Sequence, residues 1–214
     1  MSEFTSIENA SFRLQEETDL HPDTVMLAKL LMQKLDADIG FDSSWDRPNT
    51  VYSALEDLEL SGMGSWDLQQ VFFIWSLAEH MSCFDFVPHG GFQYFYHQFG
   101  LPSSDLDLGK IARAVMKDCD REFYDSLPET FRVYRGQEAS IDLGCSWTTD
   151  LKTAREFSIR GSRPGRRNEN PAIHYADIKK SDVLVALNDR EEFEIVWMMP
   201  RSDGLVTAPV PEAA

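Results

Sequence analysis

The first half of the chain carries apolar side chains at helical spacing. Within residues 21–38 they recur three and four positions apart, which predicts an amphipathic helix capped by Asp23 or Thr24. Residues 65–84 are apolar on several faces over a helical length, and they predict a central buried helix. Between these two helices, Pro48 and a Ser/Asp cluster predict a loop over residues 41–50.

The same spacing continues up to Pro128. After a His-Gly-Gly break, the aromatic residues of 92–99 predict a short helix. Residues 103–127 predict one further helix, in which Ser104 and Asp107 have the spacing of a capping box. The first half is therefore expected to be a helical bundle.

Near Pro128 the helical spacing gives way to short runs with β-strand composition. One helix is predicted between the second and third runs, and a last strand is expected before Pro209. The runs cover residues 131–135, 145–149, 172–178, 183–187 and 193–199. We predict an α+β protein in which a helical domain over 1–128 precedes an antiparallel β-sandwich domain over 129–214.

Composition and charge support two units with different roles. Apolar residues make up 43% of the 214, as in a globular protein, and the net charge is −16. Residues 1–130 hold 8 Lys and Arg against 23 Asp and Glu, whereas residues 131–214 hold 12 against 13. An acidic first half disfavours non-specific nucleic-acid binding and fits either a basic partner, such as an inhibitor or target protein, or a solvated surface.

Membrane, secretion and metal signals are absent from the sequence. No run approaches the roughly 18 to 20 apolar residues of a membrane span, and the start lacks a basic end followed by an apolar stretch. The three cysteines have no CxxC spacing, and the histidines are irregularly spaced. We expect a cytoplasmic protein with reduced thiols, no membrane partner and no metal.

The run 131–135 ends in Arg135, which is followed by Gly136. A planar guanidinium binds two phosphate oxygens at once, and a glycine lets the backbone approach a ligand closely. The pair fits an anion-binding site, and it also fits an ordinary surface turn.

Hydroxyl side chains gather where the run 145–149 gives way to a helix. Alternation places Ser146 and Thr148 on one face of the strand, which suits a ligand pocket. The same cluster suits a helix start, with Thr149 or Asp150 as the cap. Both interpretations remain open at this point.

Two carboxylates precede the last apolar run. Period-two alternation puts Glu192 and Glu194 on one side of the strand and Phe193 and Ile195 on the other. This arrangement predicts a partly desolvated acidic spot, although two solvated carboxylates at a sheet edge would have the same spacing.

Together the three motifs resemble the Arg-Ser-Glu signature of ADP-ribosyltransferases, with its Glu-x-Glu pair. YRGQ at 134–137, CSWTTDLKTAREF at 145–157 and NDREEFEIV at 188–196 occur in the order of that family, and the resemblance covers about residues 131–200. Trp147 is not the commonest residue within the Ser motif. The resemblance implies a split antiparallel β-sandwich that binds NAD in a cleft between two small sheets.

The resemblance also implies a role for each motif residue. Glu194 would stabilise the positive charge that builds on the ribose as the bond to nicotinamide breaks. Arg135 and Gly136 would bind the NAD diphosphate or the adjoining ribose. Ser146 would support the nicotinamide ribose and orient Glu194, and Thr148 would complete the NAD-binding set.

Glu192 would face the acceptor. In relatives with this Glu-x-Glu spacing the residue commonly engages an arginine, so a protein arginine is the default acceptor, and nucleic-acid bases are the other acceptor class. The resemblance implies a mono-ADP-ribosyltransferase, such as a bacterial or phage toxin or effector. An NAD glycohydrolase and a non-catalytic binding module are the alternatives.

A basic segment follows the predicted helix of the second half. It contains Arg160, Arg163, Arg166 and Arg167 among Gly and Pro residues. The segment would clamp the NAD diphosphate, guide a polyanionic acceptor, or serve only as a solvated connection. The sequence leaves these three roles open.

Overall fold

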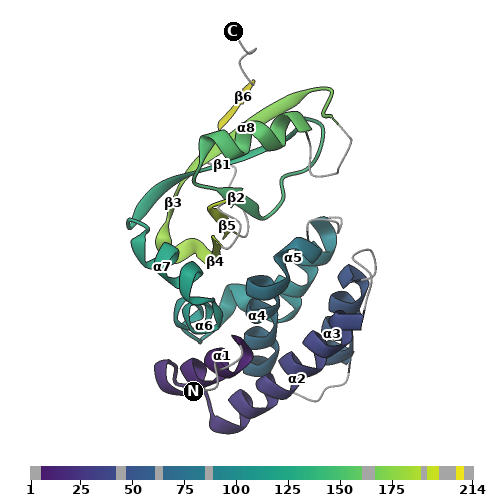
Figure 1. Ribbon diagram of the computed structural model, residues 1–214, viewed down its shortest axis with the longest axis vertical. Coiled ribbons are helices and arrows are strands. Elements are labelled where there is room, and N and C mark those ends of the chain that lie inside the picture. Colours follow the sequence, from purple (N-terminus) through teal and green to yellow (C-terminus); the bar gives the residue numbers. More distant parts are fainter. Residues whose placement is uncertain are drawn as a thin grey trace. The chain divides into compact units, whose positions relative to one another are not determined.

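The structure, a computed structural model, describes residues 6–41, 47–60, 65–84, 89–160, 167–188, 192–197 and 206–209. Helices and an antiparallel sheet follow one another along the chain, which confirms the α+β class (Figure 1). The chain forms two compact units, unit 1 (Met1–Lys117) and unit 2 (Asp118–Ala214). The division lies before the boundary expected at residue 128, because the helix over Asp118–Ser126 packs on a strand of the sheet.

The described residues of unit 1 are helical apart from their connections. The helix α4 contacts α2, α3 and α6, and residues 71–78 are all buried, which confirms the predicted central helix. The elements are α1 (Ser6–Glu17), α2 (Pro22–Phe41), α3 (Arg47–Leu60), α4 (Trp66–Phe84), α5 (His89–Gln98), the 3-10 turn η1 (Leu101–Ser103) and α6 (Leu108–Val115).

Two helices of unit 1 were not predicted. The helix α1 buries Ile7, Ala10 and Leu14, three side chains at helical spacing, and leaves Phe12 exposed among mostly polar residues. The helix α3 begins at Arg47, inside the predicted loop, with Pro48 in its first turn. Proline is compatible with a first helical turn, where its missing N–H would have no intrahelical partner, so the loop prediction was wrong at this end.

Two predicted caps were also wrong. The helix α2 starts one residue before Asp23, and the carbonyl of His21 accepts hydrogen bonds from the backbone N–H groups of Thr24 and Val25. At α6 the cap is Asp107, whose carboxylate accepts from the Lys110 N–H at 3.0 Å. Ser104 instead donates to a side-chain oxygen of α4, Gln70 Oε1, at 2.6 Å.

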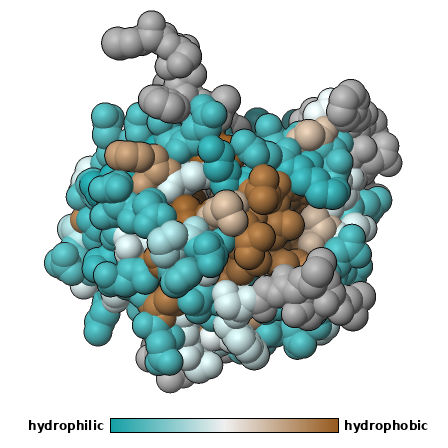
Figure 2. Space-filling view, turned by 90° about the horizontal axis from the view of Figure 1, so that it is seen from below, coloured by the Kyte–Doolittle hydropathy of each residue, from teal (hydrophilic) through white to brown (hydrophobic). Residues whose placement is uncertain are grey.

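The outer face of α2 carries an apolar stripe. Met26, Leu27 and Leu30 are 45% to 56% exposed, while Val25, Ala28 and Met32 on the same helix are buried. Figure 2 shows the side on which α1 and α2 lie in Figure 1, and apolar atoms gather there within a largely hydrophilic surface. Within the described part of unit 1, nothing covers these side chains.

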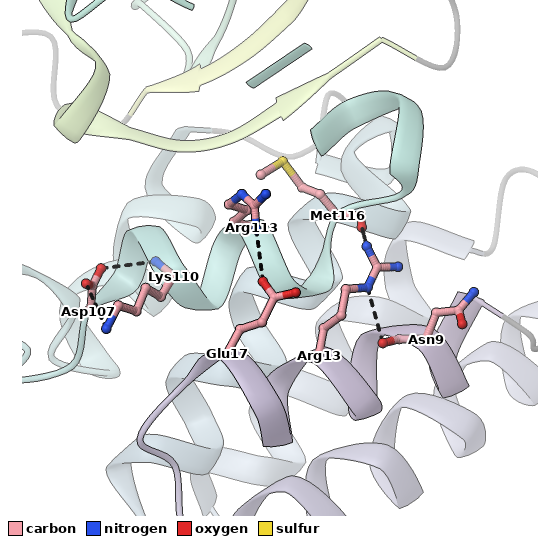
Figure 3. Close-up of polar contacts among 7 residues, drawn as sticks. All are labelled: Asn9, Arg13, Glu17, Asp107, Lys110, Arg113 and Met116. Atoms are coloured by element: carbon pink, nitrogen blue, oxygen red, sulfur yellow. Dashed lines mark hydrogen bonds and ion pairs between the residues drawn. The ribbon is translucent and has the colours of Figure 1, made fainter. Parts of the chain in front are cut away.

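The single helix predicted over 103–127 is broken into α6 and α7 (Asp118–Ser126). Met116 adopts an extended backbone conformation, with φ −66° and ψ 150°, and ends α6. Its carbonyl accepts a hydrogen bond from Arg13 Nη1 at 3.0 Å, and Arg113 of α6 pairs with Glu17 of α1 at 3.0 Å (Figure 3). Arg13 of α1 thus donates to the Met116 carbonyl in place of the backbone N–H that a further helical turn would provide.

Unit 2 is built on one six-stranded sheet whose strand order is β4-β5-β2-β1-β3-β6. Every pairing is antiparallel, and the predicted strands, including the last one, are present. The strands are β1 (Thr130–Glu138), β2 (Ser146–Thr148), β3 (Pro171–Lys179), β4 (Val183–Leu187), β5 (Glu194–Trp197) and β6 (Val206–Pro209). The antiparallel sheet is therefore confirmed, and the split sandwich stays a prediction.

Helices cover parts of this sheet. The predicted helix after β2 is α8 (Leu151–Arg160), which lies along β1, while α7 packs on β4 and the 3-10 turn η2 (Lys180–Asp182) connects β3 to β4 (Figure 1). All residues of β4 and β5 are buried. The core of unit 2 includes Trp147 and Trp197, whose rings pack edge to face with their centroids 5.2 Å apart.

Candidate active site

The sheet brings the three motifs onto neighbouring strands. β1 carries Arg135, β2 carries Ser146, and β5 begins at Glu194, and these strands are adjacent in the order β5-β2-β1. Thr148 is the register partner of both Tyr134 on β1 and Glu194 on β5. Residues about 60 positions apart in the sequence therefore meet within the middle of one sheet.

A hydrogen-bonded chain joins the three motif residues. Ser146 Oγ donates to Glu194 Oε1 at 2.5 Å, and Arg135 Nη1 donates to the backbone carbonyl of Ser146. The Glu194 residue is only 6% exposed. A buried carboxylate is costly without donors, so the Ser146 hydroxyl offsets part of its desolvation and fixes the orientation of the acid.

Gln137 holds the other side of the Arg135 guanidinium and was not identified from the sequence. Its Oε1 accepts from Arg135 Nε at 2.6 Å, and its own Nε2 donates to the Ile141 carbonyl at 2.5 Å. Gln137 is buried and lies two positions after Arg135 on the same strand, so both side chains share a face. A polar residue at that spacing within YRGQ was the available signal.

Replacing Gln137 by Met removes the acceptor from Arg135 Nε while keeping the volume of the side chain. We expect the free energy of unfolding to fall by about 1–3 kcal/mol, the cost of losing the acceptor of a part-buried, charged donor. Denaturant titration measures the loss. The matched control is Gln137→Glu, which keeps an acceptor for Arg135, so an equal loss in both variants would show that the bond to Ile141 matters instead.

Thr148 serves the local structure at the end of β2. Its Oγ1 donates to the Glu192 carbonyl at 2.7 Å and accepts from the Asp150 N–H at 3.0 Å. Asp150, rather than Thr149, caps α8, because its carboxylate accepts from the N–H groups of Lys152 and Thr153. Burial raises the pKa of Asp150, but the hydrogen bonds from Thr153 and Lys152 outweigh it and lower the pKa below its ordinary value.

The two acidic residues do not share a face through strand alternation. The strand β5 starts only at Glu194, and the preceding Phe193 has φ +50°, which is rare outside glycine. The Phe193 carbonyl accepts a hydrogen bond from the Thr149 N–H at 3.1 Å. The centroid of the Phe193 ring lies 5.7 Å from that of Phe123. The expectation that alternation aligns Glu192 with Glu194 was wrong, and the left-handed residue between them sets their relative direction instead.

Gly136 is required by a helix. A Cβ atom at this position would lie 1.7 Å from the carbonyl oxygen of Ala154 and 2.7 Å from the backbone nitrogen of Ser158. Both atoms belong to α8, so the close backbone approach that Gly136 permits is the packing of this helix on β1. The predicted approach to phosphate gains no separate support from this geometry.

His174 on β3 is a second site residue that the sequence did not reveal. It is the register partner of Arg135, and its residue is 7% exposed. Its Nδ1 lies 2.9 Å from Thr207 Oγ1, and burial, followed by the charge of Arg135, lowers the pKa of the imidazole. No hydrogen-bond partner for its buried Nε2 occurs in the part of the chain that the structure describes.

Only part of the basic segment after α8 can be placed. Arg160 pairs with Glu156 at 3.6 Å and lies over the Phe157 ring at 5.4 Å, and Arg167 is exposed. The other two arginines of the segment, at 163 and 166, lie outside the described residues. The three roles considered for this segment therefore remain open.

Comparisons with protein-family models, with curated proteins and with solved structures give no match to this chain. Across the described ranges, no cluster of three or more His, Cys, Asp or Glu side chains has the arrangement of a metal site. The described helices include none with the length and apolar character needed to cross a membrane. Among the described side chains, Cys119 and Cys145 form no disulfide bond.

Proposed function

We propose that unit 2 is a mono-ADP-ribosyltransferase that uses NAD as its co-substrate and has the split-sandwich arrangement of that family. The observation that carries the proposal is the chain of hydrogen bonds from Arg135 through Ser146 to the buried Glu194. The donor set fits NAD, because a guanidinium suits a diphosphate and a fixed carboxylate suits a ribose that becomes cationic. The protein acts in the cytoplasm and, as a toxin or effector, modifies a host component.

The residues divide the reaction between them. Breaking the bond between ribose C1 and nicotinamide leaves the electron pair on nicotinamide and positive charge on the sugar. Glu194 stabilises that charge through a carboxylate that Ser146 already orients, so little reorganisation is needed at the moment of reaction. Arg135 holds the diphosphate, and the acceptor then bonds to ribose C1 and loses a proton.

Glu192 orients the acceptor. Its backbone carbonyl accepts a hydrogen bond from Thr148, and its side chain is partly exposed, so an acceptor reaches it more easily than the buried Glu194. A protein arginine is the acceptor that a carboxylate recognises best, since its guanidinium forms bidentate pairs. Thr148 contributes by holding the backbone of Glu192. Gly136 contributes by letting α8 pack closely on β1, the strand that carries Arg135.

The test is incubation of the protein with NAD labelled in the adenylate part, together with a whole lysate. Label in a species that protease destroys identifies a protein acceptor, and loss on nuclease treatment identifies nucleic acid. Nicotinamide release without labelled macromolecules favours an NAD glycohydrolase. A calorimetric titration without NAD binding contradicts both enzymes and leaves a non-catalytic binding module.

Unit 1 supplies an interaction surface for a basic partner. Its residues 1–117 hold 7 Lys and Arg against 18 Asp and Glu, and the helix of the apolar stripe carries exposed Asp23 and Asp36 beside the ion pair of Lys34 with Asp38. An apolar stripe on an acidic surface is complementary to an amphipathic helix with a basic rim. The occupant we propose is such a helix, from an inhibitor or target protein.

A synthetic peptide of Leu and Lys in amphipathic helical order serves as the probe for this surface. We expect the double variant Leu27→Ser, Leu30→Ser of the full chain to bind it about tenfold or more weakly, because apolar area is lost while charge is kept. Fluorescence anisotropy measures the binding, and Gln33→Ser on the same helix is the control. Unchanged affinity in the double variant would mean that charge alone attracts the peptide and that the stripe is not the docking site.

A further inference from the structure

The buried Nε2 of His174 makes no contact that accounts for it among the described residues. Buried polar atoms in native proteins nearly always have a partner, and an unpaired one costs free energy comparable to a lost hydrogen bond. Within the residues that the structure describes, this nitrogen has none, although its residue is more than nine-tenths buried. A bound ligand that accepts or donates a hydrogen bond at Nε2 would supply the missing partner.

His174 lies next to Arg135 on the neighbouring strand. The two residues are opposed in the antiparallel pairing of β1 with β3, so their side chains leave the same face of the sheet a few ångströms apart. A ligand that Arg135 binds therefore comes within reach of His174.

The protonation of the ring follows from its surroundings. Burial and the neighbouring guanidinium both lower the pKa of His174, so the imidazole is neutral at neutral pH and carries one N–H. On the other side of the ring, Nδ1 faces the hydroxyl of Thr207 at 2.9 Å. When this hydroxyl donates to Nδ1, the single proton of the ring lies on Nε2.

We propose that His174 is a second anion-binding group of the Arg135 site, whose Nε2–H donates to a phosphate oxygen of the bound dinucleotide. The inference rests on the proposed function, since it deepens the NAD site. A neutral donor beside an arginine adds a directional hydrogen bond without a second positive charge, so the two side chains do not repel each other in the absence of the ligand. The exposed Thr207 fixes the ring from the far side.

Three substitutions separate this role from a structural one. His174→Asn keeps a polar group near the position of Nδ1 and loses the Nε2 donor, His174→Gln places an amide near the position of Nε2, and His174→Leu removes both. We expect the Asn and Leu variants to bind NAD roughly 10- to 100-fold more weakly, and the Gln variant to stay within a few-fold of the wild type. Isothermal calorimetry measures the affinities.

Stability without ligand provides the second readout. Because the Leu variant removes an unsatisfied donor, its melting temperature without ligand is expected to equal or exceed that of the wild type. If Nε2 had a structural partner, the melting temperature would fall in both the Leu and Asn variants. Inorganic pyrophosphate, tested by its effect on the melting temperature, reports on the phosphate contact alone.

The outcomes distinguish this inference from the proposed function. Wild-type protein that binds neither NAD nor pyrophosphate contradicts both. Wild-type protein that binds NAD while the Asn and Leu variants bind it equally well overturns the role of His174 and leaves the NAD site intact. Weakened NAD binding with unchanged pyrophosphate binding overturns the phosphate contact, whereas loss of both supports it.

Discussion

Glu194→Gln is expected to lower the rate of ADP-ribose transfer from NAD by about 10²- to 10³-fold, the usual loss when one preorganised electrostatic contact is removed. Glutamine keeps an oxygen that accepts the 2.5 Å hydrogen bond from Ser146, so the fold and the side-chain position are retained. What is lost is the negative charge that the proposed mechanism places beside the ribose. The measurement is the initial rate of label transfer, with the melting temperature recorded for the same sample.

Glu192→Gln is the matched control, because it changes the same kind of side chain two positions earlier. If Glu192 orients the acceptor, this variant still releases nicotinamide from NAD while transferring less label to a macromolecule. The two variants then differ in which half of the reaction they impair. Transfer at the wild-type rate by Glu194→Gln would remove the proposed role of the buried acid.

The sequence predicted the elements whose signals are local. Short β-branched and aromatic runs located the strands of unit 2, and the order of three motifs indicated which residues meet on β1, β2 and β5. The apolar stretch over 65–84 predicted α4 for the same reason, since a fully buried helix is apolar on every face. Such patterns need no knowledge of the neighbours.

Features that depend on pairing or on a single dihedral angle were missed. His174 joins the site only because the register of β3 sets it opposite Arg135, and nothing in the residues around it encodes that register. The left-handed φ of Phe193 interrupts the alternation on which the placement of Glu192 relied. Likewise, the break between α6 and α7 is stabilised by Arg13, which is distant in the sequence.

The prediction for Gly136 was correct in one respect and unsupported in another. Its substitution is expected to have the largest effect on the free energy of unfolding. The residue type suggested a close backbone approach, which is correct, but the approaching group is α8 rather than a phosphate. In Gly136→Ala the new methyl group would overlap the backbone of Ala154, and backbone atoms cannot rotate away as a side chain would. The helix has to shift from β1, the strand that carries Arg135.

We expect Gly136→Ala to lower the free energy of unfolding by at least about 3 kcal/mol, the upper end of ordinary overpacking, because the clash at 1.7 Å is with backbone. Denaturant titration measures the loss, and Gly40→Ala is the control, since a Cβ atom there has no neighbour within 4 Å and alanine favours a helix. If Gly136→Ala kept full stability but lost NAD binding, the glycine would serve the ligand after all. A loss of stability that precedes any effect on binding would instead assign it to the contact that holds α8 behind the site.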